Sequence, residues 1–392
     1  MRNPLSDRIV EIKPSGIRKF FDIVSEMDDA ISLGVGEPDF DTPWHIRDEG
    51  IYSLEKGRTF YTSNTGLKEL RQELAAYLQR TQGVTYDPMK EVIVTVGGSE
   101  AIDIALRAMI NPGDEVLIPQ PSYVSYEPCA ILANAKPVII ELKEENEFRL
   151  TAQELRDAIT DKTKVLILPF PNNPTGAIME KKDLEEIAEV IREKDIFIIS
   201  DEIYAELTYK EKHVSIVSLP GMQERTVLIN GFSKAYAMTG WRLGYALAPE
   251  PILQQMLKIH QFAIMCAPTT SQYAAVEALK NGDEILYTSL YWRANFAVNF
   301  LARVHYITPE CDRVATVFED IRYTPSGFTY TRPERNNLYF SPARNFYPEV
   351  KSAHTGEQLP IAKAPEGVHF EPGQESVYAG KGDFYTLRYG KY

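Results

Sequence analysis

The apolar residues between positions 90 and 282 follow two patterns along the chain. One is a short run rich in valine, isoleucine and leucine, which is typical of a buried strand. Such runs occupy residues 91–96, 115–119, 136–142, 165–168, 196–200, 226–229 and 243–247. The other pattern has apolar residues at helical spacing, and it predicts helices over residues 67–80, 183–194 and 250–264 and directly after the strand at 91–96. Strands that alternate with helices indicate an α/β fold.

One stretch, residues 226–248, carries two basic residues between two predicted strands. Lys234 follows a short turn after the strand 226–229, and Arg242 immediately precedes the strand 243–247. Open α/β sheets place their ligand crevices at strand ends, and a lysine in such a crevice is partly desolvated, which lowers its pKa and frees a nucleophilic amine. An arginine fork suits a phosphate. Pyridoxal phosphate needs both features, an amine that reacts with its aldehyde and a group that binds its phosphate.

A glycine-rich turn after the strand 91–96 is a candidate anion site. Its sequence is GGSE at 97–100, and it opens a helix. The first N–H groups of a helix lack partners within the helix and lie at the positive end of its dipole, so they favour an anion. The same residues with Ala101 also approximate the G-x-S-x-G nucleophile elbow of α/β-hydrolases. A serine hydrolase built on Ser99 is therefore an alternative.

Three other strand ends carry residues that suit a flat, charged ring. Tyr123 follows the strand 115–119 and can stack on a ring, although it can equally be a core tyrosine. Asn173 lies in the turn sequence PNNPTG, which is also ordinary loop chemistry. Asp201 ends the strand 196–200, where a carboxylate could bind a metal, face solvent, or keep a pyridine nitrogen protonated.

Taken together, these motifs resemble class I/II aminotransferases, which are pyridoxal-phosphate enzymes of fold type I. The resemblance rests on GGSE, NPTG, the D-E-x-Y sequence at 201–204, and the Ser-Lys pair followed eight residues later by Arg242. The resemblance is strong over residues 30–282. Within the family, the sequence most resembles bacterial aspartate-type and diaminopimelate-type members. The resemblance implies a large domain with a mixed, mostly parallel sheet flanked by helices, and a smaller α+β domain. The cofactor-binding residues that it implies are Gly98, Ser99, Glu100, Tyr123, Asn173, Asp201, Tyr204, Ser233, Lys234 and Arg242.

The resemblance also implies catalytic roles for three of these residues. Lys234 would form the internal aldimine with pyridoxal phosphate and then shuttle a proton. Asp201 would keep the ring nitrogen of the cofactor protonated. Tyr204 would donate a hydrogen bond to its phenolic oxygen. Asn173 has a binding role instead: it would hydrogen-bond the same oxygen and also lie against the substrate. No metal is implied.

Three further assignments come from the resemblance alone. Gly36, within the sequence SLGVGEPDF, would lie near the substrate carboxylate. Tyr61 would reach across a homodimer interface to the phosphate of the partner subunit. Arg388 follows the Pro372-Gly373 turn within an aromatic run that is typical of a strand, and it would bind the substrate α-carboxylate.

The expected domain organisation follows the strength of the match. Residues 1–45 are expected to form an N-terminal arm and part of the small domain, residues 46–285 the large cofactor-binding domain, and residues 286–392 the C-terminal small domain. The last of these matches weakly, and two segments, 325–330 and 337–342, compete there for the family's small-domain strand.

Composition narrows the possible partners and the compartment. The 392 residues carry a net charge of −13 without a block of lysine and arginine, which argues against nucleic-acid binding. No apolar stretch is long enough for a membrane span. Three scattered cysteines argue against a disulfide framework and fit a cytoplasmic location. We therefore expect an aminotransferase acting on an amino acid and a 2-oxo acid; the identity of the amino acid, and a carbon–sulfur lyase on the same scaffold, stay open.

Overall fold

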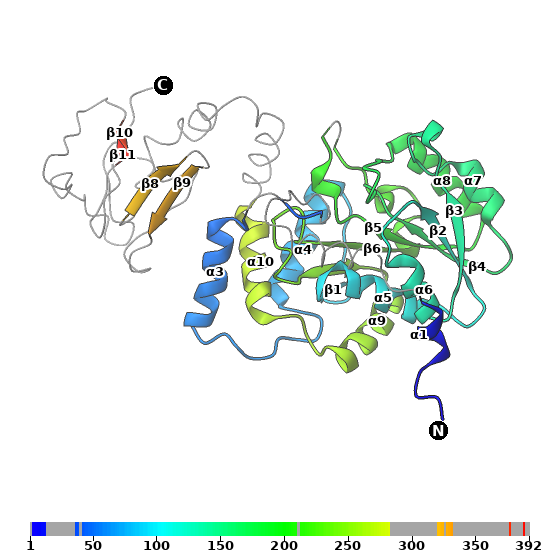
Figure 1. Ribbon diagram of the computed structural model, residues 1–392, viewed down its shortest axis with the longest axis horizontal. Helices are drawn as coiled ribbons and strands as arrows, with labels where there is room; N and C mark the ends of the chain where they lie inside the picture. Colours follow the sequence, from blue (N-terminus) through cyan, green and yellow to red (C-terminus); the bar gives the residue numbers. More distant parts are fainter. Residues whose placement is uncertain are drawn as a thin grey trace, which may run out of the picture. The chain divides into compact units, whose positions relative to one another are not determined.

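The computed structural model describes residues 2–12, 36–38, 41–209 and 212–282, together with the backbone of short strand segments later in the chain (Figure 1). The chain divides into two units, Met1–Leu286 and Tyr287–Tyr392. In the second unit, β8 (Asp320–Thr324) pairs antiparallel with β9 (Gly327–Thr331), and β10 (Ser376–Val377) pairs antiparallel with β11 (Leu387–Arg388). Strand β9 overlaps the first of the two competing segments, whereas 337–342 lies outside the described residues.

A seven-stranded sheet forms the centre of the first unit, in the order β1-β7-β6-β5-β4-β2-β3. Its strands are β1 (Val92–Thr95), β2 (Glu115–Gln120), β3 (Lys136–Glu141), β4 (Thr163–Leu168), β5 (Phe197–Asp201), β6 (Thr226–Gly231) and β7 (Gly244–Leu247). Strands β2 to β6 are parallel, while β7 lies antiparallel between β6 and β1. The predicted mixed, mostly parallel sheet is confirmed, and each strand falls on one of the predicted apolar runs.

Helices cover both faces of this sheet (Figure 1). They are α3 (Trp44–Glu55), α4 (Lys68–Gln82), α5 (Gly97–Met109), α6 (Tyr126–Leu132), α7 (Ala152–Ala158), α8 (Lys181–Glu193), α9 (Glu250–Ala263) and α10 (Thr269–Asn281). The short helix α1 (Asp7–Glu11) buries no residue and contacts α6. One apolar core joins the sheet to α5, α6 and α9, and the other joins it to α3, α4, α7, α8 and α10. In the described residues, therefore, the first unit has a helix–sheet–helix arrangement.

The strand alternation decides which side chains face which helices. Successive residues of a strand point to opposite faces, so Ile198 joins the α4 and α8 core while Ile199 joins the α5 and α6 core. Asp201, two residues after Ile199, consequently lies on the α5 and α6 side at the end of β5. The alternation of side chains along β5 therefore places the Asp201 carboxylate on the face of the sheet that α6 covers.

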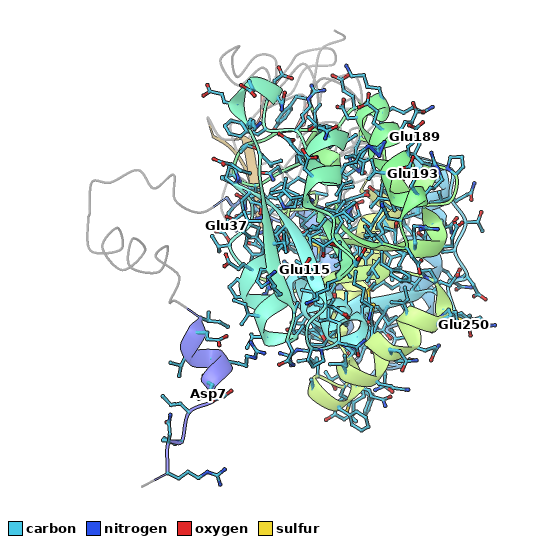
Figure 2. The ribbon with its side chains drawn as sticks, turned by 90° about the vertical axis from the view of Figure 1, so that its right-hand side faces the viewer. Asp7, Glu37, Glu115, Glu189, Glu193 and Glu250 are labelled. Carbon is cyan, nitrogen blue, oxygen red and sulfur yellow. The ribbon has the colours of Figure 1, made fainter. Side chains whose placement is uncertain are left out.

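Acidic side chains are distributed over several elements of the surface. Figure 2 labels Glu189 and Glu193 on α8 and Glu250 at the start of α9, and all three are exposed. Glu115 on β2 is a buried exception, and it binds Lys136 and Thr160. In the part of the chain that the structure describes, no helix has the length and apolar character needed to cross a membrane.

A capping box opens α7, as the sequence TAQE at 151–154 predicts. The Thr151 hydroxyl accepts from the Glu154 N–H at 3.2 Å, and the Glu154 carboxylate accepts from the Thr151 N–H at 3.0 Å. We expect Thr151→Ala to lower the free energy of unfolding by about 1 kcal/mol, because helix N–H groups lose their acceptor. Denaturant unfolding checks this, with Thr151→Ser as the variant that keeps the acceptor. Equal midpoints for Thr151→Ala and wild type would contradict it.

Candidate active site

The predicted site residues of the seven-stranded sheet gather along one of its edges, which is the edge formed by the strand ends and not by the outer strands β1 and β3. Strands β1, β2, β4, β5 and β6 all end there, since β1 and β6 are both antiparallel to β7. The reversed strand β7 begins at the same edge, and this places Arg242 opposite the turn that carries Lys234. The crevice at strand ends that the sequence predicted is therefore built from six strands.

The GGSE turn packs closely against Arg242 and β7. Gly97 has a left-handed backbone with φ +75°, and an added Cβ there would lie 2.8 Å from Nη2 of Arg242. A Cβ on Gly244 would lie 2.5 Å from the main-chain nitrogen of Gly98. Side chains at these glycines would collide with their neighbours, so glycine allows the guanidinium and the N-terminus of α5 to meet.

Ser99 and Glu100 differ in the direction of their side chains. Ser99 is exposed in the first turn of α5. The Glu100 carboxylate turns back, accepting from the Val96 N–H at 2.5 Å and contacting Nδ1 of the buried His260 at 2.6 Å. Glu100 therefore offers its main chain to the turn, while its carboxylate fixes the start of the helix.

The three histidines that the structure describes do not support a serine hydrolase. Among the described residues, each histidine is paired with a carboxylate: His45 with Glu277, His213 with Glu202, and His260 with Glu100. None of these three rings is hydrogen-bonded to Ser99, which a nucleophile elbow would require of its base.

Asp201 is a buried acid held by two donors. Its side chain is 6% exposed; Oδ2 accepts from the Tyr126 hydroxyl at 2.7 Å and Oδ1 from the Ile203 N–H at 3.3 Å. Burial raises the pKa of Asp201 to about 6 and Glu202 adds to the rise, while the bonds from Tyr126 and Ile203 oppose it. Each oxygen keeps capacity for a further donor.

Aromatic and amide groups line the crevice beside Asp201. The ring of Tyr123 meets that of Tyr126 edge to face, with centroids 5.5 Å apart. Asn173 Nδ2 donates to the Tyr204 hydroxyl at 3.4 Å. Burial raises the pKa of Tyr204, and the charge of Asp201 raises it further, so Tyr204 stays a protonated donor near neutral pH.

The half-buried side chain of Lys234 lies between Gly36 and the ring of Tyr204. Its amine donates to the Gly36 carbonyl and lies 5.5 Å from the centroid of the Tyr204 ring. Burial lowers the pKa of the Lys234 ammonium; the Glu37 carboxylate opposes this and Arg242 adds to it. The sequence-based expectation of a desolvated lysine thus has a structural counterpart.

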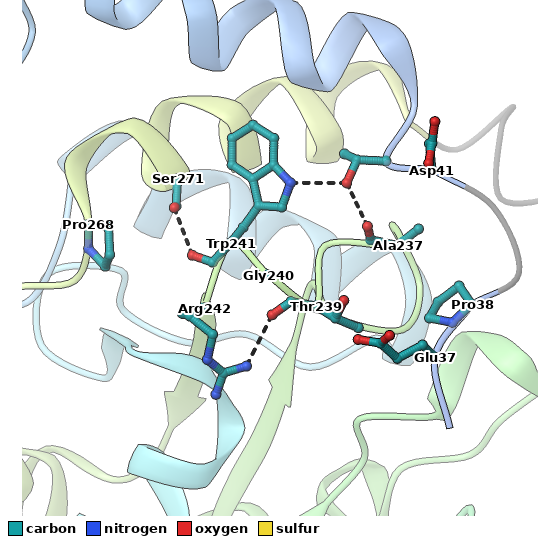
Figure 3. A pocket seen from close by; sticks show the side chains of 11 residues that line it. Glu37, Pro38, Asp41, Ala237, Thr239, Gly240, Trp241, Arg242, Pro268 and Ser271 are labelled. Carbon is teal, nitrogen blue, oxygen red and sulfur yellow. Dashed lines mark hydrogen bonds between the residues drawn. The ribbon is translucent and has the colours of Figure 1, made fainter. Parts of the chain in front are cut away.

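A cavity of about 650 Å³ opens next to Arg242 (Figure 3). Three groups of residues line it: Glu37, Pro38, Asp41 and Thr42; the loop 237–242 after Lys234; and Pro268 and Ser271 at the start of α10. Nη1 of Arg242 donates to the Thr239 carbonyl at 3.1 Å. This bond fixes the guanidinium at the mouth of the crevice.

Three predicted residues remain. Ser233 is half-buried and directly precedes Lys234. Tyr61 is 79% exposed on the loop before α4. Arg388 lies on β11 opposite Ser376, and its side chain is outside the described residues. The assignment of the substrate carboxylate to Arg388 therefore stays a prediction, as does the assignment of residues 1–45 to the small domain.

Two groups near the crevice were missed by the sequence reasoning. Tyr126 lies three residues after Tyr123, and this aromatic pair at the start of α6 was the available signal. Glu202 is buried beside Asp201, where it accepts from Ser200 at 3.0 Å and Ser215 at 2.6 Å and contacts His213 at 2.7 Å. Its only signal was a second carboxylate after a strand made mostly of apolar residues.

The residues present fit pyridoxal phosphate. The turn at Gly97 and the guanidinium of Arg242 form a positively charged corner for a phosphate. The buried Asp201 carboxyl, with its pKa raised by desolvation, needs a cationic partner such as a protonated ring nitrogen. Lys234 supplies an amine whose pKa is already lowered. All three lie at the same edge of one sheet.

Comparison with known proteins agrees with this fit. The family model of aminotransferase class I and II matches residues 28–344. An aspartate aminotransferase of Pyrococcus abyssi is 50% identical over 278 residues, 71% of this chain and 72% of that protein. An aromatic-amino-acid aminotransferase of Thermococcus litoralis is 48% identical over 278 residues, 71% and 72% of the two chains.

A solved structure extends the similarity to the fold. The aspartate aminotransferase from Thermus thermophilus with maleate matches with a TM-score of 0.72 and 35% identity, covering 78% of this chain and 81% of that one. The sheet, the crevice and these matches agree: the chain belongs to the class I and II aminotransferases and is a pyridoxal-phosphate-dependent transaminase that moves amino groups between amino acids and 2-oxo acids.

Proposed function

We propose that this chain works as a cytoplasmic homodimer, with Lys234, Asp201 and Tyr204 as its catalytic residues. The observation that carries the proposal is the half-buried Lys234 amine, which shares one sheet edge with Arg242 and Asp201. Two free cysteines, Cys129 and Cys266, are consistent with a reducing compartment.

Each residue of the crevice has a proposed task. The main chain of Gly98, Ser99 and Glu100, with Ser233 and Arg242, binds the phosphate, and Tyr123 lies against the ring. Asp201 holds a proton at the ring nitrogen. Tyr204 and Asn173 donate to the phenolic oxygen. The proximity of these groups in the described residues supports the proposal.

Lys234 is the proposed proton carrier. Pyridoxal phosphate, when bound, supplies an aldehyde that takes up amines and a ring that accepts electrons. The Lys234 amine would take the proton from Cα of the amino acid and pass it to C4′ of the cofactor, and it would carry a proton from C4′ back to Cα in the reverse half of the reaction. The Gly36 carbonyl orients this amine, and burial keeps a share of it unprotonated. Gly36 and Asn173 also border the space for the substrate.

The amino donor is the first property to test. Relatives named for aspartate and for aromatic amino acids are both near half identical to this chain, so L-aspartate and L-tyrosine are the donors to try with 2-oxoglutarate. We expect turnover with at least one of them. Lys234→Ala should lower kcat by at least about a hundredfold, because the proton carrier is lost, while the phosphate still binds.

The matched control for that experiment is Lys162→Ala. Lys162 is an exposed lysine at the start of β4, at the opposite edge of the sheet. The Lys162→Ala variant should keep the activity of the wild type. Full turnover by Lys234→Ala would show that another group carries the proton.

Tyr126→Phe tests the role of Asp201 through pH. The charged carboxylate is the form that holds a protonated ring nitrogen, so affinity for pyridoxal phosphate should rise as pH passes about 6, where Asp201 loses its proton. The Tyr126 bond favours the charged form. Its loss should raise the pKa of Asp201 and move the acid side of the affinity profile upward by about one pH unit.

The control for this prediction is Tyr86→Phe. Tyr86 is buried, and its hydroxyl has no hydrogen-bond partner among the described residues. The pyridoxal phosphate affinity of the Tyr86→Phe variant should depend on pH in the same way as that of the wild type. If Tyr126→Phe titrates like the wild type as well, then Tyr126 does not set the ionisation of Asp201.

An exposed aromatic patch supports the homodimer. It consists of Phe60, Tyr61, Phe262 and Met265, of which Phe60 is 81% and Phe262 86% exposed. Asn64 Nδ2 donates to the Met265 carbonyl at 2.8 Å, and this bond joins the two segments that carry the patch. Exposed apolar clusters of this kind mark association surfaces, and a partner seated here would lie against Tyr61.

Phe262→Asp should therefore dissociate the homodimer, because a charge would be buried without a partner. Sedimentation velocity should show a monomer with little activity. The control is Ile139→Asp on β3, at the other end of the strand order from β1 and likewise exposed; it should sediment as wild type. An active Phe262→Asp monomer, or a wild-type monomer, would refute the dimeric site.

A further inference from the structure

The loop that joins Lys234 to Arg242 has an unfavourable backbone at two positions. Ala237 and Arg242 both have φ +52°, in the left-handed region that favours glycine. This conformation is unfavourable for a residue with a side chain, because the Cβ atom crowds the following carbonyl oxygen. Contacts with other elements must therefore hold the loop in this shape.

A hydrogen-bonded relay supplies such contacts (Figure 3). Nε1 of Trp241 donates to the Thr42 hydroxyl at 3.0 Å, and that hydroxyl donates to the Ala237 carbonyl at 2.6 Å. We call these three groups the Thr42 relay. Thr42 is 8% exposed, and its hydroxyl serves as both acceptor and donor, which an apolar side chain of the same shape cannot do.

Trp241, the donor of the Thr42 relay, is itself fixed. Its carbonyl accepts from the Ser271 hydroxyl at 2.8 Å, at the start of α10. The edge of its ring lies so close to Gly50 of α3 that an added Cβ would be 2.7 Å from Cη2. Helices α3 and α10 therefore set the position of the indole, and the indole sets the position of the Thr42 hydroxyl.

The loop that the relay holds begins directly after the proposed catalytic lysine. The relay binds this loop at Ala237 and Trp241, and the Ala237 N–H donates to the Lys234 carbonyl at 3.4 Å. The Lys234 amine itself donates to the Gly36 carbonyl. Without the relay, the loop would lose the support that keeps Lys234 in place at that carbonyl.

We propose that Thr42 and Trp241 are positioning residues for the transamination: the Thr42 relay fixes the loop that follows Lys234 and so orients the Lys234 amine at the Gly36 carbonyl. The proposal rests on the proposed role of Lys234. Neither side chain needs to contact the substrate or the phosphate, and Arg242 has a separate support in its packing against Gly97. Removing the relay should therefore disturb the amine and spare the anion site at Gly97 and Arg242.

Two probes separate these effects in the full-length chain after its cofactor has been removed. Pyridoxal phosphate reports capture by the lysine, through the rate at which its visible absorption band changes. Pyridoxamine phosphate has no aldehyde, so its dissociation constant reports binding alone. For Thr42→Val we expect capture to be at least about tenfold slower, as a misdirected nucleophile would be, with the pyridoxamine phosphate dissociation constant unchanged.

Further variants test whether the relay acts as a unit. Thr42→Ser keeps the hydroxyl and should restore the capture rate. Trp241→Phe keeps an aromatic ring but removes the N–H, and it should slow capture less than Thr42→Val. The double variant should be no slower than Thr42→Val alone, because both changes break the same relay.

Matched controls distinguish the proposal from a general loss of stability and from failure of the Lys234 assignment. Thr226→Val removes another buried hydroxyl, which donates to the Met222 carbonyl at 2.7 Å at the far end of β6; it should lower the melting temperature and leave both probes unchanged. Lys234→Ala should abolish capture and keep pyridoxamine phosphate binding. Capture by Lys234→Ala would overturn the role of the lysine itself.

Two results would overturn the relay while leaving Lys234 in place. One is capture by Thr42→Val at the wild-type rate. The other is an equal loss of capture and of pyridoxamine phosphate binding, which would show that Thr42 only supports the fold of the site.

Discussion

The site depends on the close approach of β7 to the glycine turn at the start of α5. Strand β7 runs against its neighbours, and for that reason an arginine that precedes a strand can meet residues that follow strands. The approach leaves no room for a side chain at Gly97 or Gly244. Fixed in this way, the Arg242 guanidinium and the free N–H groups of α5 form one positively charged corner at the sheet edge.

Desolvation shifts the pKa values of two groups that carry opposite charges when ionised. Burial raises the pKa of Asp201 to about 6 and lowers the pKa of Lys234, so both are shifted toward their neutral forms. A ligand with a protonated ring nitrogen and a phosphate would favour the charged carboxylate and neutralise the positive corner. The charges of the crevice therefore match those of pyridoxal phosphate, and this agrees with the family to which the chain belongs.

Much of this arrangement could be predicted from the sequence because it depends on local patterns. Apolar runs located the strands, and polar residues at their ends located Asp201, Lys234 and Arg242. The Thr42 relay could not be predicted, since Thr42 lies 195 positions from Ala237 and 199 from Trp241, and only packing brings them together. The Tyr126 bond spans 75 positions and was missed for the same reason.

The most direct test of the central claim is to identify the residue that carries the cofactor. The protein loaded with pyridoxal phosphate would be reduced with borohydride, digested, and examined by mass spectrometry for the peptide with the added phosphopyridoxyl mass. The account predicts that the label lies on Lys234 and that the visible absorption band is lost in proportion. A label on another lysine, or a band that borohydride leaves unchanged, would contradict it.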